Sequence, residues 1–162
     1  MNPIVENGVH YGNYVVFDSP PYSQRDLTGV DSQLQSIPTQ EVFIGKMVGA
    51  MRYFFGRTGG QTFLDHFPNP GENYPFKGFV FHGPPGSGKT EAVIEAGRRL
   101  YIELAAEGIE VRLFHISTGD IARKNYGESE ERMVRIFNDA REKAEQGTRT
   151  ILLFDDIDTL LM

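Results

Sequence analysis

The chain has 162 residues, of which 40% are hydrophobic, and this is enough for about one domain with a buried core. The formal net charge of −6 and the lack of a basic run give no indication of direct nucleic-acid binding. The sequence has no cysteine, which excludes disulfides and thiolate metal sites, and no apolar stretch of about 18 residues, which predicts a cytoplasmic protein without membrane contact.

The first part of the chain has weak patterning. Residues 1–25 are expected to form an arm or the tail of a preceding module, with one short strand at 14–17, and residues 26–31 are expected to form a turn. From about residue 39 to 55, apolar side chains recur at helical spacing and predict an amphipathic helix that packs in the core. The members of this stripe are Val42, Phe43, Met47, Met51, Phe54 and Phe55.

A short apolar run at 78–82 predicts a buried strand, and a glycine-rich loop follows it directly. Residues 83–90 read Gly-Pro-Pro-Gly-Ser-Gly-Lys-Thr and match the phosphate-binding pattern G-x-x-x-x-G-K-[ST]. The glycines let the backbone turn its N–H groups toward phosphate oxygens, and the next helix, expected from residue 91 to about 108, presents its positive end there.

The loop therefore predicts a nucleotide site with bound Mg²⁺. Lys89 is the candidate for contact with the β- and γ-phosphates, and the Thr90 hydroxyl is a candidate magnesium ligand. The nucleotide-binding candidates of this unit are Gly83, Pro84, Pro85, Gly86, Ser87, Gly88, Lys89, Thr90 and Glu91.

Strands and helices alternate in the rest of the chain. We expect a strand at 110–116, a short helix near 117–122, a long helix at 128–146 and a buried strand at 150–154. This alternation predicts an α/β fold with a parallel sheet and right-handed crossovers.

Acidic residues follow the last predicted strand, at the edge where open α/β sheets bind their ligands. Asp155 is expected to hold Mg²⁺ directly or through water, and Asp156 to orient and polarise an attacking water. Asp158 is instead expected to cap a following helix. The histidines at 10, 66, 82 and 115 do not have metal-ligand spacing.

Three separated segments resemble the AAA+ ATPase family, in particular the proteasome-associated ATPases of its protein-remodelling branch. They are residues 26–31, residues 81–90 with their double proline, and the stretch from 124–130 through the predicted helix to 154–158. The resemblance covers about residues 26–162. It implies a P-loop NTPase three-layer sandwich that binds ATP and Mg²⁺ and hydrolyses ATP to drive protein remodelling or unfolding.

The resemblance also implies roles by position. Backbone groups near Leu27, Thr28 and Gly29 would contact the adenine, and Lys89 and Asp156 would be the catalytic residues. The family works as a ring, usually a hexamer, whose central pore grips a polypeptide. The pore positions here are Lys124, Asn125, Tyr126 and Gly127.

The sequence departs from the family pattern at three points. Asp156 replaces a glutamate and is one methylene shorter, which predicts slow hydrolysis with intact ATP binding. The family's pore aromatic falls on Asn125, whereas Tyr126 lies one residue nearer the glycine, so Tyr126 either grips substrate or is an ordinary loop tyrosine.

The third departure is that the sequence stops at Met162, before the family's later strands, polar sensor, arginine fingers and lid. We therefore expect a partial AAA+ large domain. The first and third predicted strands would then either flank a vacant position or pair directly, 78–82 with 150–154.

Two other functions stay open at this point. One is a nucleotide-binding switch or scaffold with little hydrolysis, which the Asp156 replacement favours. The other is a helicase-loader type ATPase or a P-loop kinase. The 124–130 segment argues against a kinase, and a helicase loader would show salt-sensitive binding to DNA or RNA.

Overall fold

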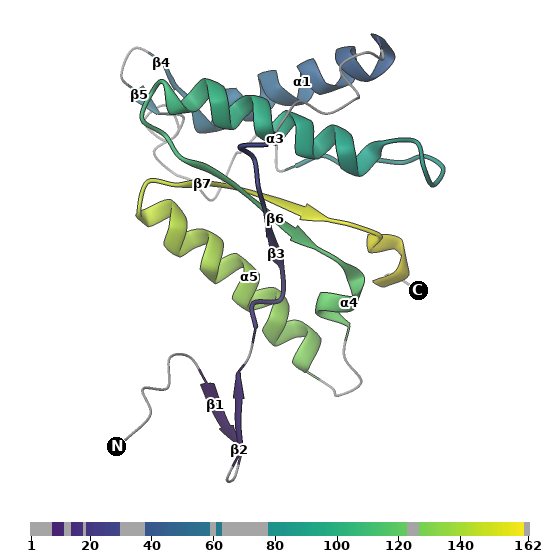
Figure 1. The fold of residues 1–162 in the computed structure, drawn as a ribbon, viewed down its shortest axis with the longest axis vertical. Coiled ribbons are helices and arrows are strands. Elements are labelled where there is room, and N and C mark those ends of the chain that lie inside the picture. The colour runs from purple at the N-terminus through teal and green to yellow at the C-terminus, as the bar shows by residue number, and fades with distance from the viewer. Residues whose placement is uncertain are drawn as a thin grey trace, which may run out of the picture.

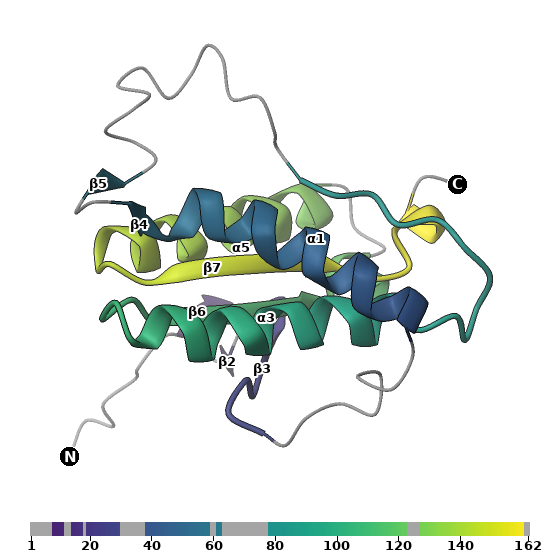
Figure 2. The ribbon, with the colours of Figure 1, turned by 90° about the horizontal axis from the view of Figure 1, so that it is seen from above.

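The computed structural model describes residues 8–11, 14–17, 19–29, 38–58, 61–62, 78–122 and 127–160. Helices cover both faces of a central sheet, so the fold has the three layers expected from the sequence (Figures 1 and 2). The long helices α1 (Pro38–Phe55) and α3 (Lys89–Ala105) lie on one face, and α5 (Glu128–Glu145) lies on the other (Figure 1).

The central sheet has the strand order β3-β6-β7, with β3 at Ser23–Arg25, β6 at Val111–Ile116 and β7 at Arg149–Phe154. β6 and β7 are parallel along their whole length, as the α/β alternation predicts. β3 is antiparallel to β6, so the sheet is mixed and not purely parallel. This third strand comes from the predicted N-terminal arm.

The prediction of a buried strand at 78–82 is wrong. These residues form no strand, and Val80 is 96% exposed. Within the described ranges β7 pairs only with β6, so 78–82 and β7 do not pair directly either. An apolar run becomes a strand only where a neighbouring strand pairs with its backbone N–H and C=O groups. Here the apolar side chain of Phe81 packs against a helix: its ring lies edge-on to that of Phe43 of α1, with ring centroids 5.2 Å apart.

The strand at 14–17 and the short helix near 117–122 lie at their predicted positions, whereas the sequence patterns do not predict the short strands at 8–11, 57–58 and 61–62. The short helix α4 spans Thr118–Ile121, and a 3₁₀ helix, η2, spans Ile157–Leu160. Two small antiparallel hairpins join β1 (Gly8–Tyr11) to β2 (Tyr14–Phe17) and β4 (Arg57–Thr58) to β5 (Gln61–Thr62). No helix in the described ranges combines the length and apolar character that crossing a membrane requires.

Strand alternation divides the core into two clusters, one on each face of the sheet. Odd-numbered strand residues such as Leu113 and Leu153 pack toward α1 and α3. Even-numbered residues such as Phe114 pack toward α4 and α5, where Ile136 is fully buried. The parity of a residue on β6 or β7 therefore decides which helix layer its side chain meets.

The predicted apolar stripe of α1 is partly wrong. The most deeply buried side chains of α1 are Met47, which belongs to the predicted stripe, and Ile44, which does not. Two predicted members are exposed, Val42 by 63% and Phe43 by 38%. The helix packs against α3, and ion pairs fix its position there: Arg99 on α3 donates two hydrogen bonds, of 2.6 and 2.7 Å, to the Glu41 carboxylate. The hydrogen bonds from Arg99 lower the pKa of Glu41 below its usual value.

β3 is attached to the sheet by more than its backbone ladder. Tyr22 stacks on Phe114 with ring centroids 4.0 Å apart, and its hydroxyl donates to Asp139 Oδ2 of α5 at 2.8 Å. Burial, together with this acidic neighbour, raises the pKa of Tyr22 to about 12. The arm thus connects the edge of the sheet to the helix on its far face.

Ile136 and Val134 on α5 test the packing of this layer. Replacing the fully buried Ile136 by alanine should lower the free energy of unfolding by about 2–5 kcal/mol, because the cavity under α5 cannot refill. Val134→Ala, on the same helix at a position 58% exposed, should change it by less than about 0.5 kcal/mol. Urea unfolding followed by circular dichroism measures both, and equal losses would contradict the assigned helix face.

Candidate nucleotide-binding site

The phosphate loop leads from the extended 78–82 segment into α3 and adopts a backbone that suits glycine. Gly86 and Gly88 have φ of 76° and 83°, a region that side-chain-bearing residues rarely enter. Gly88 is the N-cap of α3. The first-turn N–H groups of a helix have no acceptors within it, so this end of α3 offers hydrogen-bond donors and a partial positive charge to an anion.

Lys89 lies over this loop. Its Nζ donates to the backbone oxygens of Gly83 and Pro84, at 2.8 Å each, and to Ser87 Oγ at 3.3 Å. All three acceptors are uncharged. The positive charge of the lysine is therefore kept beside the loop without being cancelled by these contacts.

A glutamine on α1 also contacts the loop, and no pattern in the sequence predicts this contact. Gln40 Nε2 donates to the backbone oxygen of Ser87 at 3.0 Å. The next residue, Glu41, is the one paired with Arg99, so α1 is fixed to both the loop and α3 at this end.

Thr90 and Asp155 meet, although 65 positions separate them in the sequence. The Thr90 hydroxyl lies 3.1 Å from each carboxylate oxygen of Asp155. The backbone N–H of Asp155 donates to the Ile116 oxygen at 2.8 Å, which extends the β6–β7 pairing by one residue and holds the acid at the strand end. The two residues predicted to share a magnesium ion are thus brought together.

His115 on β6 is a third member of this cluster, and its role was missed. Its Nε2 lies 3.0 Å from Asp155 Oδ2, and its Nδ1 accepts from Arg25 Nε of β3 at 2.9 Å. The signal that could have found it is parity, because His115 is odd-numbered on β6 and faces the α3 layer with the residues around the loop.

Asp156, the residue after the candidate magnesium ligand Asp155, has a left-handed backbone conformation. Asp156 has φ of 54°, and its carbonyl oxygen accepts from the Thr118 hydroxyl of α4 at 2.8 Å. Its side chain is exposed. Asp158 lies inside η2, which begins at Ile157, so the prediction that it caps a helix from outside is wrong.

These residues fit ATP with Mg²⁺. A hydroxyl and a carboxylate are the hard oxygen donors that magnesium prefers, and they stand beside a loop with donor groups and a lysine. Gly83 is also closely approached, since a Cβ there would lie 3.3 Å from Ser87 Oγ.

A sequence model of the family described as "ATPase family associated with various cellular activities (AAA)" matches residues 79–162, about half of the chain. The chain belongs to the AAA ATPase family. The matched region includes the phosphate loop, β6, α5, β7 and both strand-end acids. The P-loop NTPase fold expected from the sequence is therefore confirmed.

Individual relatives give the same result. The chain is 33% identical over 144 residues to a proteasome-associated ATPase of Acidimicrobium ferrooxidans, which covers 87% of this chain and 22% of the relative. It is 37% identical over 101 residues to one from Kribbella flavida, covering 60% of this chain and 17% of that protein. A cell division cycle protein 48 homolog of Archaeoglobus fulgidus is 36% identical over 86 residues, covering 53% of this chain and 10% of the relative.

The chain spans about a fifth of the length of the two proteasome-associated ATPases. The identities given above confirm the resemblance to the proteasome-associated ATPases that the motifs predict.

Of the 26–31 turn expected to touch adenine in this AAA chain, residues 26–29 are described, and hydrogen bonds between Asp26 and Thr28 bend the backbone there. The Asp26 carboxylate accepts from the backbone N–H and the hydroxyl of Thr28, at 2.8 and 2.6 Å, and these bonds lower its pKa. Leu27 is buried against α3, whereas Thr28 and Gly29 are exposed. Of the pore positions, Lys124, Asn125 and Tyr126 lie outside the described residues, and Gly127 is the N-cap of α5.

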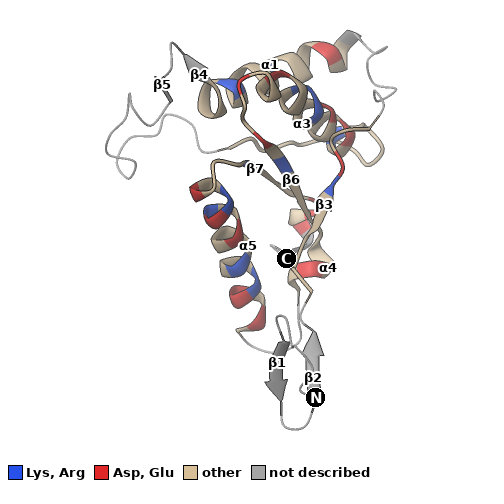
Figure 3. Ribbon diagram, turned by 60° about the vertical axis from the view of Figure 1, so that its left-hand side comes forward, with Lys and Arg blue, Asp and Glu red and all other residues tan. Residues whose placement is uncertain are grey.

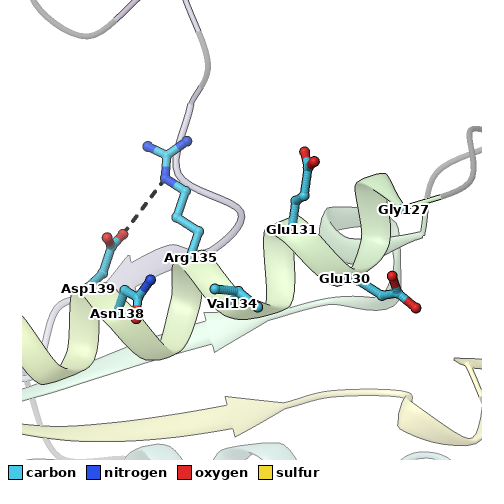
Figure 4. Close-up of a pocket in the computed structure, with 7 residues that line it drawn as sticks. All are labelled: Gly127, Glu130, Glu131, Val134, Arg135, Asn138 and Asp139. Atoms are coloured by element: carbon cyan, nitrogen blue, oxygen red, sulfur yellow. Dashed lines mark ion pairs between the residues drawn. The ribbon is translucent and has the colours of Figure 1, made fainter.

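An open hollow lies along α5, and residues of that helix line it (Figure 4). Both acidic and basic residues are spread along this helix (Figure 3). Arg135 and Asp139 form an ion pair in the hollow, with 4.0 Å between Arg135 Nε and Asp139 Oδ2. The hollow is separate from the phosphate loop and contains none of the predicted site residues except Gly127.

Two glycine substitutions test the loop backbone. Gly88→Ala should lower the free energy of unfolding by about 1–2 kcal/mol, because alanine is strained at a φ of 83°. Gly45→Ala, in the exposed middle of α1 with open space around it, should raise it by about 0.5–1 kcal/mol. Denaturant unfolding of both variants checks these opposite signs, and a stabilised Gly88→Ala protein would contradict the observed loop.

Proposed function

We propose that this chain is the ATP-binding part of an AAA ATPase that hydrolyses ATP with Mg²⁺ and uses the energy to remodel or unfold proteins. One observation supports this most strongly: the Thr90 hydroxyl lies 3.1 Å from the Asp155 carboxylate, beside a complete phosphate loop. A folded chain has no evident packing need for this pair at the end of β7, whereas a magnesium–nucleotide site requires both groups close together.

Each residue then has a distinct part. The loop amides and Lys89 bind the phosphates, Lys89 by exchanging its present carbonyl acceptors for phosphate oxygens. Thr90 and Asp155 would hold Mg²⁺, which neutralises the charge that develops on the phosphates. Asp156 directs the attacking water from a backbone that Thr118 holds in place. Residues 27–29 approach the base.

The assembly is also part of the proposal. Similarity to the proteasome-associated ATPases and to the cell division cycle protein 48 homolog supports a ring of the family's kind, usually a hexamer. In this ring Lys124, Asn125, Tyr126 and Gly127 would face a polypeptide. We place the start of the ATP-binding domain near residue 26 and the protein in the cytoplasm.

A nucleotide-binding switch with little hydrolysis is the second candidate. The shorter Asp156 side chain favours it, because a carboxylate displaced by about 1 Å can lower the rate by roughly 10²-fold. The two candidates share the binding site and differ only in turnover.

Nucleotide binding is tested at Lys89. The Lys89→Ala protein should bind a fluorescent ATP analogue in Mg²⁺ at least about 10-fold more weakly than the unchanged chain, because a charge-assisted contact to phosphate is lost. Lys46→Ala, which removes an exposed lysine from α1, should bind within about twofold of the unchanged chain. Equal affinity of the Lys89→Ala and unchanged proteins would refute the site.

Turnover is tested at Asp156. In the whole protein, Asp156→Glu should raise phosphate release by up to about 10²-fold and leave ATP affinity unchanged, because the longer side chain restores the position of the carboxylate. Steady-state ATPase assays measure the rates. A normal turnover number that the glutamate variant does not raise would contradict slow hydrolysis.

A further inference from the structure

Three side chains, from β3, from β6 and from the end of β7, form a line of hydrogen bonds that ends at Asp155, the candidate magnesium ligand. Arg25 of β3 contacts His115 of β6, and His115 contacts Asp155 at the end of β7. The His115 side chain is only 12% exposed and that of Asp155 30% exposed. The line therefore runs from the protein surface into a partly buried site.

The direction of each hydrogen bond follows from the chemistry of arginine. A guanidinium has only donors, and Arg25 Nε and Nη2 lie 2.9 and 2.8 Å from His115 Nδ1, so Nδ1 must accept. The hydrogen of the neutral ring is then on Nε2. His115 consequently donates to Asp155 Oδ2.

The hydrogen bond from His115 Nε2 fixes the rotation of the Asp155 carboxylate. The Thr90 hydroxyl is equally far from both carboxylate oxygens and cannot by itself fix the rotation of the carboxylate. His115 binds Oδ2 alone, so the two oxygens become different. Groups behind a metal ligand orient it in this way in many proteins.

We propose that His115 is a positioning residue, held in one tautomer by Arg25, that fixes the Asp155 carboxylate for magnesium–nucleotide binding. The inference rests on the proposed function. It also gives β3 a task beyond covering the sheet edge, because Arg25 immediately precedes the 26–29 turn assigned to the base. Displacement of this strand would release His115 and loosen the metal ligand.

The main experiment uses a fluorescent ATP analogue and the full chain. The measured quantity is the magnesium factor, the Kd in EDTA divided by the Kd in Mg²⁺. Arg25→Gln and His115→Phe should each reduce this factor by about 10-fold or more, with the Kd in EDTA within about twofold of the unchanged chain. Arg25→Lys, which keeps a donor for Nδ1, should recover part of the loss.

Arg112→Gln is the matched control. Arg112 is on β6, one strand from Arg25, and donates to Glu110 at 2.9 Å outside the line. The Arg112→Gln protein should have the same magnesium factor as the unchanged chain. Thermal unfolding by circular dichroism shows whether each variant folds. Arg25 is exposed, and Tyr22 still anchors its strand, so Arg25→Gln tests the proposal even if His115→Phe does not fold.

Nitrogen NMR of the His115 ring gives a readout that needs no nucleotide. The unchanged chain should show the hydrogen on Nε2, and Arg25→Gln should shift the ring toward a mixture of tautomers. A hydrogen on Nδ1 in the unchanged chain would overturn the inference.

The binding outcomes separate the two proposals. A magnesium factor near one in the unchanged chain overturns both the proposed function and the inference. A large factor that Arg25→Gln and His115→Phe leave unaltered overturns the inference alone. A factor that falls in both variants and persists in Arg112→Gln supports it.

Discussion

The site depends on the parallel pairing of β6 with β7. This pairing brings the ends of both strands to one edge of the sheet, where the backbone N–H of Asp155 still bonds to β6. With the register fixed, strand alternation turns His115 toward the α3 layer and Leu152 toward α5. Asp155 then meets the first turn of α3 at Thr90. A shift of one residue in this register would turn each side chain to the opposite face and separate the pair.

The helices and the arm hold this arrangement from outside. α1 is attached through Gln40 to the phosphate loop and through Glu41 to α3, so the loop is supported from a segment far earlier in the chain. β3 is held on the opposite edge by the stacking of Tyr22 and by its bond to α5. The groups proposed to bind the phosphates therefore depend on contacts made by residues outside the sequence motif.

The residues proposed to bind the nucleotide and the proposed hydrolytic residue, Asp156, have different surroundings. Lys89 donates to oxygens of the phosphate loop, and Asp155 lies within hydrogen-bond distance of Thr90 and His115. Asp156 is exposed and has a left-handed backbone with φ of 54°, and its carbonyl oxygen accepts a hydrogen bond from the Thr118 hydroxyl. The proposal of slow hydrolysis rests on the Asp156 side chain, which is one methylene shorter than that of glutamate, and membership of the AAA family is compatible with it.

The sequence by itself determined the local features: the phosphate loop, the helices that follow it and the acids after a buried strand. Their signals are contiguous patterns, such as the spacing of glycine and lysine before Thr90. Only the tertiary structure decided which strands pair. It left 78–82 outside the sheet, added β3 and placed His115 between Arg25 and Asp155. These results depend on hydrogen-bonding partners far apart in the sequence, such as Arg25 and His115, which are 90 positions apart, and no local pattern encodes such pairs.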